Sequence, residues 1–130
     1  EVVISEEEID YVKTLNPDIF IAMSQQGLDK YISRMDAEKG IIIVDSTLVN
    51  SVPPEYKNVY RLEATAIAEE KLGARVVANV VMLGAFARIS GYVEPENLKK
   101  AVSENIAPKF IEWNISAFDE GYKLADALMQ

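Results

Sequence analysis

Two short apolar runs, with no polar residue alternating within them, constrain the fold of this chain most strongly. Ile19 to Met23 follows a turn-forming segment, and Ile41 to Val44 follows a glycine. This pattern is typical of strands that are covered on both faces, because a strand with one solvent-exposed face alternates polar and apolar residues. A helix from about Gln25 to Arg34, capped by Ser24, is expected between them. Strand, helix and strand in this order predict a β-α-β unit and a parallel sheet.

Shorter signals place further strands and turns around this unit. Val2 to Ile4 is a β-branched run that predicts an edge or broken strand. Asn16-Pro17-Asp18 is typical of a turn. Asn58 to Leu62 follows a proline-containing loop and predicts a shorter, more polar strand near an edge of the sheet.

The second half of the chain predicts helices without strands. Thr65 can cap a helix that runs to Leu72 and stops at Gly73, the expected left-handed glycine. The largely apolar run from Val77 to Ile89 predicts a helix buried on most sides and ended by Gly91.

Two more helices are expected after these. Pro95 suits the first turn of one, and Pro108 breaks that helix and opens the last. Apolar faces are expected on both: Leu98, Val102 and Ile106 on the first, and Ile111, Ile115, Phe118, Tyr122, Ala125 and Met129 on the second. These patterns together predict one α/β domain over residues 1–130, with a mostly parallel sheet, covering helices and a helical C-terminal segment.

The composition excludes several kinds of site and partner. The 130 residues include no cysteine and no histidine, so this chain alone cannot supply the ligands of an iron–sulfur cluster or structural zinc, or a Cys-His or Ser-His nucleophile. Its 13 basic and 21 acidic residues give a net charge of −8, the sign opposite to that needed for binding nucleic acid phosphates. No stretch approaches the roughly 20 apolar residues that cross a bilayer. We therefore expect a cytoplasmic protein that binds neither nucleic acid nor membrane.

Polar clusters follow the predicted strands, at the sheet edge where open parallel sheets bind ligands. Ser24 and Gln25 follow the first buried strand, Asp45 and Ser46 the second, and Thr65 the third. They could form a rim of hydrogen-bonding groups, with helix N-termini behind Ser24 and Thr65 offering N–H groups to an anion. Each has a structural alternative, since Ser24 and Thr65 are good helix caps and Asp45 can close a turn.

Asn79 is the sixth candidate. It is a strongly polar residue ahead of the apolar run Val80 to Leu83, and a buried amide must find partners. It could cap the helix, bond a neighbouring loop or contact a ligand. Acidic pairs lie where a solvated surface is expected, and the chain has no glycine-rich phosphate loop or carboxylate-rich metal loop. We therefore assign it no catalytic and no metal-binding residue.

Several segments form a combined pattern that is more specific than any one of them: Pro17 to Gln25, Lys30-Tyr31, Gly40 to Ser46, Ala66 to Glu69, Leu72-Gly73, Ala78 to Ala85 and Gly121-Tyr122. In order and spacing they resemble the gamma subunit of 2-oxoacid:ferredoxin (acceptor) oxidoreductases. The form Ala22-Met23-Ser24-Gln25 is more similar to the 2-oxoglutarate branch of that family than to the pyruvate branch.

The resemblance implies a Rossmann-like subunit of an enzyme that oxidatively decarboxylates a 2-oxoacid with coenzyme A and passes electrons to ferredoxin or another acceptor. Thiamine diphosphate, Mg and iron–sulfur clusters are then held by the alpha, beta and, where present, delta subunits, and coenzyme A is a co-substrate. This chain would be structural and inactive alone. Whether it contacts coenzyme A is left open.

The N-terminal strand and glycine-rich GxGGQG-type turn of that family are missing from this sequence. We therefore expect residues 1–130 to be the C-terminal part of a longer subunit. Two alternatives stand beside the 2-oxoglutarate assignment. One is the gamma subunit of a pyruvate or indolepyruvate oxidoreductase, and the other is a free-standing domain that binds a small molecule or nucleotide at the rim.

Overall fold

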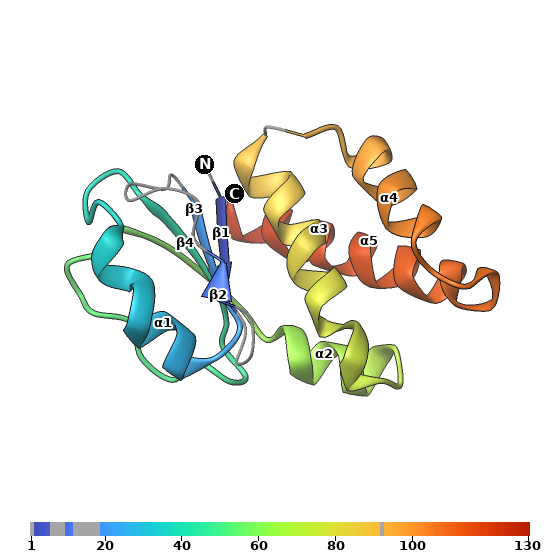
Figure 1. Cartoon of the computed structure of the whole chain (residues 1–130), viewed down its shortest axis with the longest axis horizontal. Helices are drawn as coiled ribbons and strands as arrows, with labels where there is room; N and C mark the ends of the chain where they lie inside the picture. Colours follow the sequence, from blue (N-terminus) through green and yellow to red (C-terminus); the bar gives the residue numbers. More distant parts are fainter. Residues whose placement is uncertain (1, 6–9, 12–18, 92) are drawn as a thin grey trace. The chain divides into compact units, whose positions relative to one another are not determined.

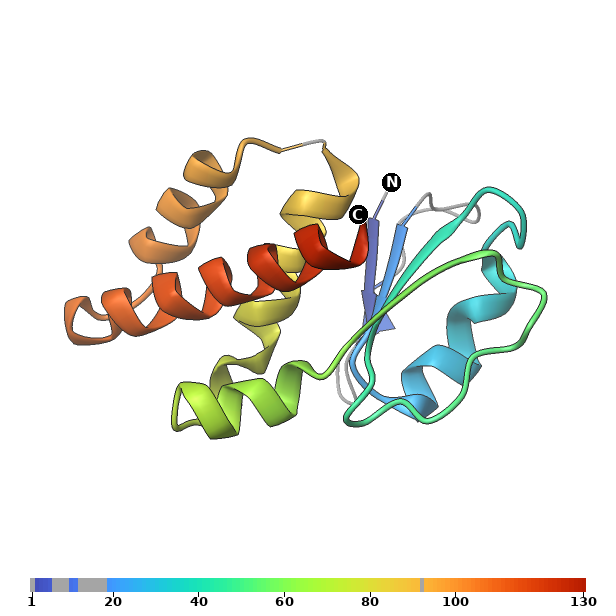
Figure 2. The same cartoon turned by 180° about the vertical axis from the view of Figure 1, so that it is seen from behind.

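The computed structural model describes residues 2–5, 10–11, 19–91 and 93–130 (Figures 1 and 2). The chain divides into two compact units, Glu1–Glu63 and Ala64–Gln130, and each is described by itself. The first unit contains the sheet, and the described residues of the second unit form helices and no strand. The turn expected at Asn16-Pro17-Asp18 lies outside the described residues.

The sheet of the first unit is mostly parallel, as the two apolar runs predict. Its strands are β1 (Val2–Ser5), β2 (Asp10–Tyr11), β3 (Ile19–Ala22), β4 (Ile41–Asp45) and β5 (Asn58–Leu62), in the order β2-β1-β3-β4-β5. All neighbours are parallel except β2, which pairs antiparallel with the end of β1. β5 lies at one edge, as its polarity predicts. β1 is not the edge strand along its whole length, because the short β2 pairs with its last two residues.

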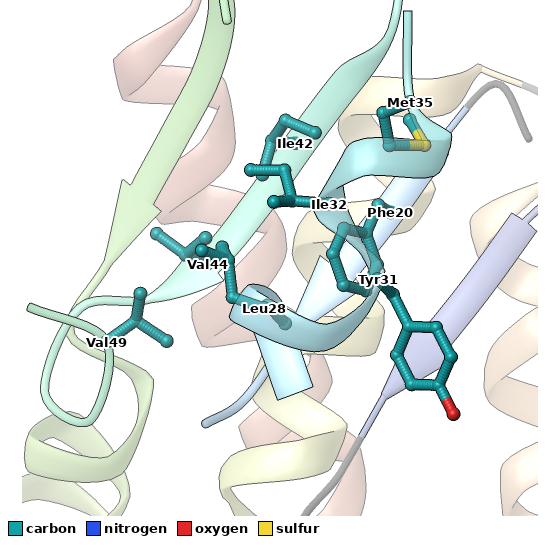
Figure 3. Packing of buried hydrophobic residues seen from close by; sticks show 9 residues of the cluster. Phe20, Leu28, Tyr31, Ile32, Met35, Ile42, Val44 and Val49 are labelled. Carbon is teal, nitrogen blue, oxygen red and sulfur yellow. The ribbon is translucent and has the colours of Figure 1, made fainter. Parts of the chain in front are cut away.

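The two central strands are buried on both faces. Phe20 and Ala22 of β3 share one face with the corresponding residues of β4, because side chains alternate along a strand. Figure 3 shows this face packed into one apolar cluster with the helix that follows β3 and with residues of the loops after that helix and after β4. The cluster comprises Phe20, Ala22, Leu28, Tyr31, Ile32, Met35, Ile42, Val44 and Val49. Ile19, Ile21 and Ile43 on the opposite face are also at most 2% exposed. This double burial explains why neither run alternates with polar residues.

The helix α1 (Gln25–Tyr31) connects β3 and β4. Ser24 caps it as predicted, since its Oγ accepts a hydrogen bond from the backbone N–H of Gly27 at 3.0 Å. The 3-10 turn η1 (Ile32–Arg34) completes the span that the sequence predicts. No helix lies between β4 and β5. A loop connects the two strands, and the Tyr56 hydroxyl in this loop donates a hydrogen bond to the carbonyl of Ile32 at 2.8 Å.

The second unit consists of α2 (Ala64–Lys71), α3 (Ala78–Ser90), α4 (Pro95–Glu104) and α5 (Ile111–Leu128), with short 3-10 turns η2 (Arg75–Val77) and η3 (Pro108–Phe110). Gly73 and Gly91 follow α2 and α3 with φ of +74° and +68°, the left-handed conformation that the sequence predicts at both helix ends. Pro95 opens α4, also as predicted.

Backbone contact between α3 and α5 is the closest packing in this unit, and Figures 1 and 2 both show the two helices crossing. A Cβ added to Gly84 of α3 would lie 2.0 Å from the carbonyl oxygen of Phe118. A Cβ added to Gly121 of α5 would lie 1.8 Å from the carbonyl oxygen of Val81. Each helix therefore presents a glycine to the backbone of the other.

This contact shifts the buried face of α5 from the one expected. Phe118 and Ala125 are buried as predicted, but Ile111, Ile115 and Tyr122 are half-buried and Met129 is 39% exposed. The buried residues of α5 are Asn114, Ala117, Phe118, Gly121 and Ala125. Phe118 and Gly121 are the two whose backbone lies against α3, and the small Ala117, Gly121 and Ala125 leave room for that close approach. The expected face of α4 is likewise only half-buried.

Three ion pairs link α5 to the other helices, one to each: Lys71 to Glu120 at 2.8 Å, Arg88 to Asp126 at 2.7 Å and Lys99 to Asp119 at 2.7 Å. The hydrogen bond to Asp119 raises the pKa of Lys99. Pairs this exposed contribute about 0 to 1 kcal/mol each, so they orient the helices more than they stabilise them.

We predict that Gly121→Ala lowers the stability of the helical unit by about 1 to 3 kcal/mol, because its new Cβ overpacks against the backbone of α3. Urea unfolding followed by helical circular dichroism measures this. At an exposed helix position with no close neighbour, a Gly→Ala change would stabilise the helix by about 1 kcal/mol. Ser116→Ala, at an exposed position of the same helix, is the control and should change little. A higher urea midpoint for Gly121→Ala would contradict the contact.

Candidate functional site

The carboxyl edge of the sheet brings together four of the six predicted site residues. β3 and β4 are adjacent and parallel, with Ala22 opposite Val44. Ser24 and Gln25 follow β3, while Asp45 ends β4 and Ser46 follows it, so these two polar pairs extend from the same edge. The expected convergence at the first unit is therefore observed for these four residues.

Gln25 fastens the loop after β4 to the start of α1. Its Oε1 accepts hydrogen bonds from the N–H groups of Asn50 at 2.8 Å and Ser51 at 3.0 Å. Its Nε2 donates to the carbonyl of Ser51 and to Asp29 Oδ1, both at 3.0 Å. A glutamine amide has two donors and two acceptor sites, so these four bonds use its whole capacity. In this geometry Gln25 is a loop clamp and has no group left for a ligand.

Asp45 is fully buried at the end of β4 and shapes the turn that follows. Its Oδ1 accepts a hydrogen bond from the N–H of Thr47 at 3.1 Å, and its carbonyl accepts from Leu48 and Val49. The N–H of Ser46 extends the strand pairing by donating to the carbonyl of Leu62 at 2.7 Å. Asp45 therefore closes the turn, the structural alternative that its position predicts.

The anion site expected behind Ser24 has little support in the geometry. Its Oγ is engaged by Gly27, and its carbonyl accepts from Leu28, which is ordinary capping. The α1 helix is only seven residues long, so its dipole is weak. Ser46, the remaining candidate at this edge, has an uncharged hydroxyl and follows the buried acid Asp45, so neither side chain attracts a phosphate.

Thr65 and Asn79 lie in the second unit, and two expectations about them are wrong. α2 begins at Ala64, so Thr65 lies buried inside its first turn and is not the N-cap. Asn79 is exposed, and Val77 holds the cap position of α3. The 3-10 turn before α3 sets its phase so that Asn79 faces outward. The buried amide of this unit is Asn114, which donates to the carbonyl of Phe110 at 2.9 Å.

Asn79 instead lines a shallow groove of about 360 Å³ that the sequence did not predict. The groove lies where the start of α3 meets the start of α5, and its lining is Val76, Val77, Asn79, Val80, Ile106, Phe110, Trp113 and Asn114. Trp113, the single tryptophan of the chain, was the one signal in the sequence that could have marked it.

The electrostatics of the described residues do not point to acid–base chemistry. Hydrogen bonds from the N–H groups of Lys39 and Glu38 lower the pKa of Asp36. Burial, and then the charge of Glu55, raises the pKa of Tyr56. These shifts favour the forms already present at neutral pH, whereas a general acid or base needs a pKa moved toward neutrality. Among the described residues, no three acidic side chains are grouped so as to hold a metal ion.

Comparison with protein families gives the decisive observation: residues 1–124 match the family described as pyruvate ferredoxin/flavodoxin oxidoreductase. The chain belongs to this family. It is 42% identical to the 2-oxoglutarate synthase subunit KorC of Methanothermobacter marburgensis, over 95% of this chain and 69% of that protein. The pyruvate synthase subunit PorC of the same organism is 30% identical, over 83% of this chain and 60% of that one.

A solved structure agrees with both the fold and the family. The keto/oxoacid ferredoxin oxidoreductase gamma subunit from Geobacter sulfurreducens matches with a TM-score of 0.80 and 34% identity, over 85% of this chain and 64% of that one. The resemblance to gamma subunits is therefore confirmed, as is the Rossmann-like α/β class. The chain spans about two thirds of the length of these relatives. No helix in its described part is both long and apolar enough to span a membrane.

We predict that Gln25→Ala releases the loop after β4, because the backbone N–H groups of Asn50 and Ser51 lose their common acceptor, the Gln25 Oε1. Amide hydrogen exchange at Asn50 and Ser51 should quicken about five- to tenfold, as expected for loss of about 1 kcal/mol of hydrogen bonding. Gln26→Ala, at the exposed neighbouring position, is the control. Unchanged exchange at both amides in Gln25→Ala would show that the clamp does not hold the loop.

Proposed function

We propose that this chain is part of the gamma subunit of a 2-oxoglutarate:ferredoxin or other acceptor oxidoreductase of the cytoplasm. The reaction would be 2-oxoacid + CoA + oxidised acceptor → acyl-CoA + CO2 + H⁺ + acceptor reduced by two electrons. The observation that carries this proposal is the greater identity to a 2-oxoglutarate synthase subunit than to the pyruvate synthase subunit of one organism. The same difference argues against the pyruvate alternative.

The role proposed for this chain within the enzyme is structural. The reaction needs thiamine diphosphate with Mg, and iron–sulfur clusters to carry electrons. Without cysteine or histidine this chain does not fit the iron–sulfur clusters, and its described residues form no group of three or more metal-binding carboxylates. We assign those groups to alpha, beta or delta subunits, and the contact with ferredoxin or another acceptor to the assembled complex.

The geometry of the rim limits how this chain could contact coenzyme A. Among the predicted rim residues of the first unit, Ser24 and Gln25 are engaged in capping and in the loop clamp, and Asp45 is a buried acid. A chain with a net charge of −8 also attracts the phosphates of coenzyme A poorly. Any contact would therefore involve the edge at Ser46 and form in the assembled enzyme.

The proposal is tested by co-expressing the tagged full subunit with the products of the neighbouring genes. We expect thiamine-binding subunits to co-purify, and the complex to reduce a viologen dye with 2-oxoglutarate and coenzyme A faster than with pyruvate. The isolated chain should show no turnover. Recovery without any thiamine-binding partner, or a preference for pyruvate, would defeat the proposal.

We also predict that calorimetry of the isolated chain with coenzyme A shows no micromolar binding, for the electrostatic reason above. The assembled complex is the positive control. Micromolar binding by the isolated chain would favour the alternative of a free-standing small-molecule or nucleotide-binding domain.

A further inference from the structure

The groove at the start of α3 and α5 is an unusual feature of this charged chain. None of its eight lining residues is charged, although charged residues make up 26% of the sequence. Val76 is 75% exposed and Phe110 is 39% exposed, and both are among the few large apolar side chains that the described structure leaves in solvent. A contiguous apolar surface of this kind marks an interaction site more often than scattered apolar residues do.

Two contacts hold Trp113, which we call the floor of the groove. The indole Nε1 of Trp113 donates a hydrogen bond to the carbonyl of Leu72 at 2.6 Å, which fixes the ring. Phe110 packs against Trp113 with the ring centroids 6.1 Å apart. Aromatic side chains held in place lose little conformational entropy on binding, and such residues dominate the energetics of protein interfaces.

Two cations adjoin residues of this apolar surface along the chain. Arg75 directly precedes Val76 and its side chain is 63% exposed, with Glu69 as a partner at 3.5 Å. Lys109 directly precedes Phe110 and lies 5.1 Å from the centre of its ring. An apolar surface between exposed cations is complementary to apolar side chains flanked by carboxylates.

We propose that this groove docks a thiamine-binding subunit of the same oxidoreductase through a segment with apolar anchors flanked by acidic residues, an inference that rests on the proposed function. The anchors would cover Val76 and Phe110 on the Trp113 floor, and the carboxylates would face Arg75 and Lys109. A second copy of this chain is a poorer occupant, because a symmetric contact of the groove with itself would bring its own cations together.

The test uses the assembled oxidoreductase made with the full subunit. Val76→Asp should weaken binding to the partner at least tenfold in a titration, because it puts a charge into the apolar contact. Ser116→Asp adds the same charge at an exposed position of α5 that does not line the groove and should bind as the unchanged subunit does. Since Val76 is exposed, the melting curve of the full subunit should not change, and a lowered melting temperature would mean that the groove is covered within the subunit itself, which overturns the proposal.

Charge reversal separates the kind of partner. Lys109→Glu should weaken binding several-fold and reduce its salt dependence, whereas stronger binding would mean a basic partner and overturn the proposal. As a direct readout, the 19F resonance of 5-fluorotryptophan at Trp113 should shift when the labelled subunit joins its partners. A self-association of the isolated chain that Val76→Asp abolishes would show that a second copy occupies the groove, which also overturns it.

These outcomes are distinct from failure of the proposed function. If the unchanged subunit does not assemble with thiamine-binding partners, the proposed function fails. If it assembles and Val76→Asp assembles equally well, only the groove is excluded as the docking surface.

Discussion

The helical unit depends on the contact of α3 with α5 through Gly84 and Gly121. A Cβ at either position would come within about 2 Å of a carbonyl of the other helix, so no other residue fits there without displacing the backbone. This approach selects which face of α5 is buried, and it sets the distance between the starts of the two helices. The groove between those starts, with Trp113 as its floor, follows from the crossing.

In the sheet unit, the corresponding constraint is the double burial of β3 and β4. Because neither strand has a solvent-exposed face, polar side chains are confined to the strand ends. Ser24, Gln25, Asp45 and Ser46 lie there. Most of the hydrogen bonds found there hold the chain itself: a cap, a clamp and a turn. The edge that resembles a ligand site in sequence is thus largely occupied by its own loops.

The predictions that succeeded depend on local physical chemistry. The cap at Ser24 and the left-handed glycines at 73 and 91 require only near neighbours, and the buried strands follow from an apolar pattern within five residues. The wrong predictions for Thr65 and Asn79 share one cause. A helix turns about 100° per residue, so a start displaced by one or two residues moves a side chain between core and solvent.

Features that depend on tertiary contact could not be derived from the pattern. The clamp joins Gln25 to Asn50 and Ser51, which lie 25 and 26 positions later in the sequence. The groove joins two helix starts that are more than 30 residues apart in the sequence. Both glycines of the helix crossing were part of the family pattern, but their mutual contact was invisible in it. The role that we propose is that of a subunit whose partners hold the catalytic groups and whose own surface serves assembly.

Zero-length carbodiimide cross-linking of the assembled oxidoreductase tests whether the groove docks an acidic partner segment. This reaction joins a lysine amine only to a carboxylate in contact with it. If the groove docks such a segment, Lys109 becomes linked to an aspartate or glutamate of a thiamine-binding subunit, as identified by peptide mass spectrometry. A Lys109 that stays unlinked and freely acetylated in the intact complex would contradict it.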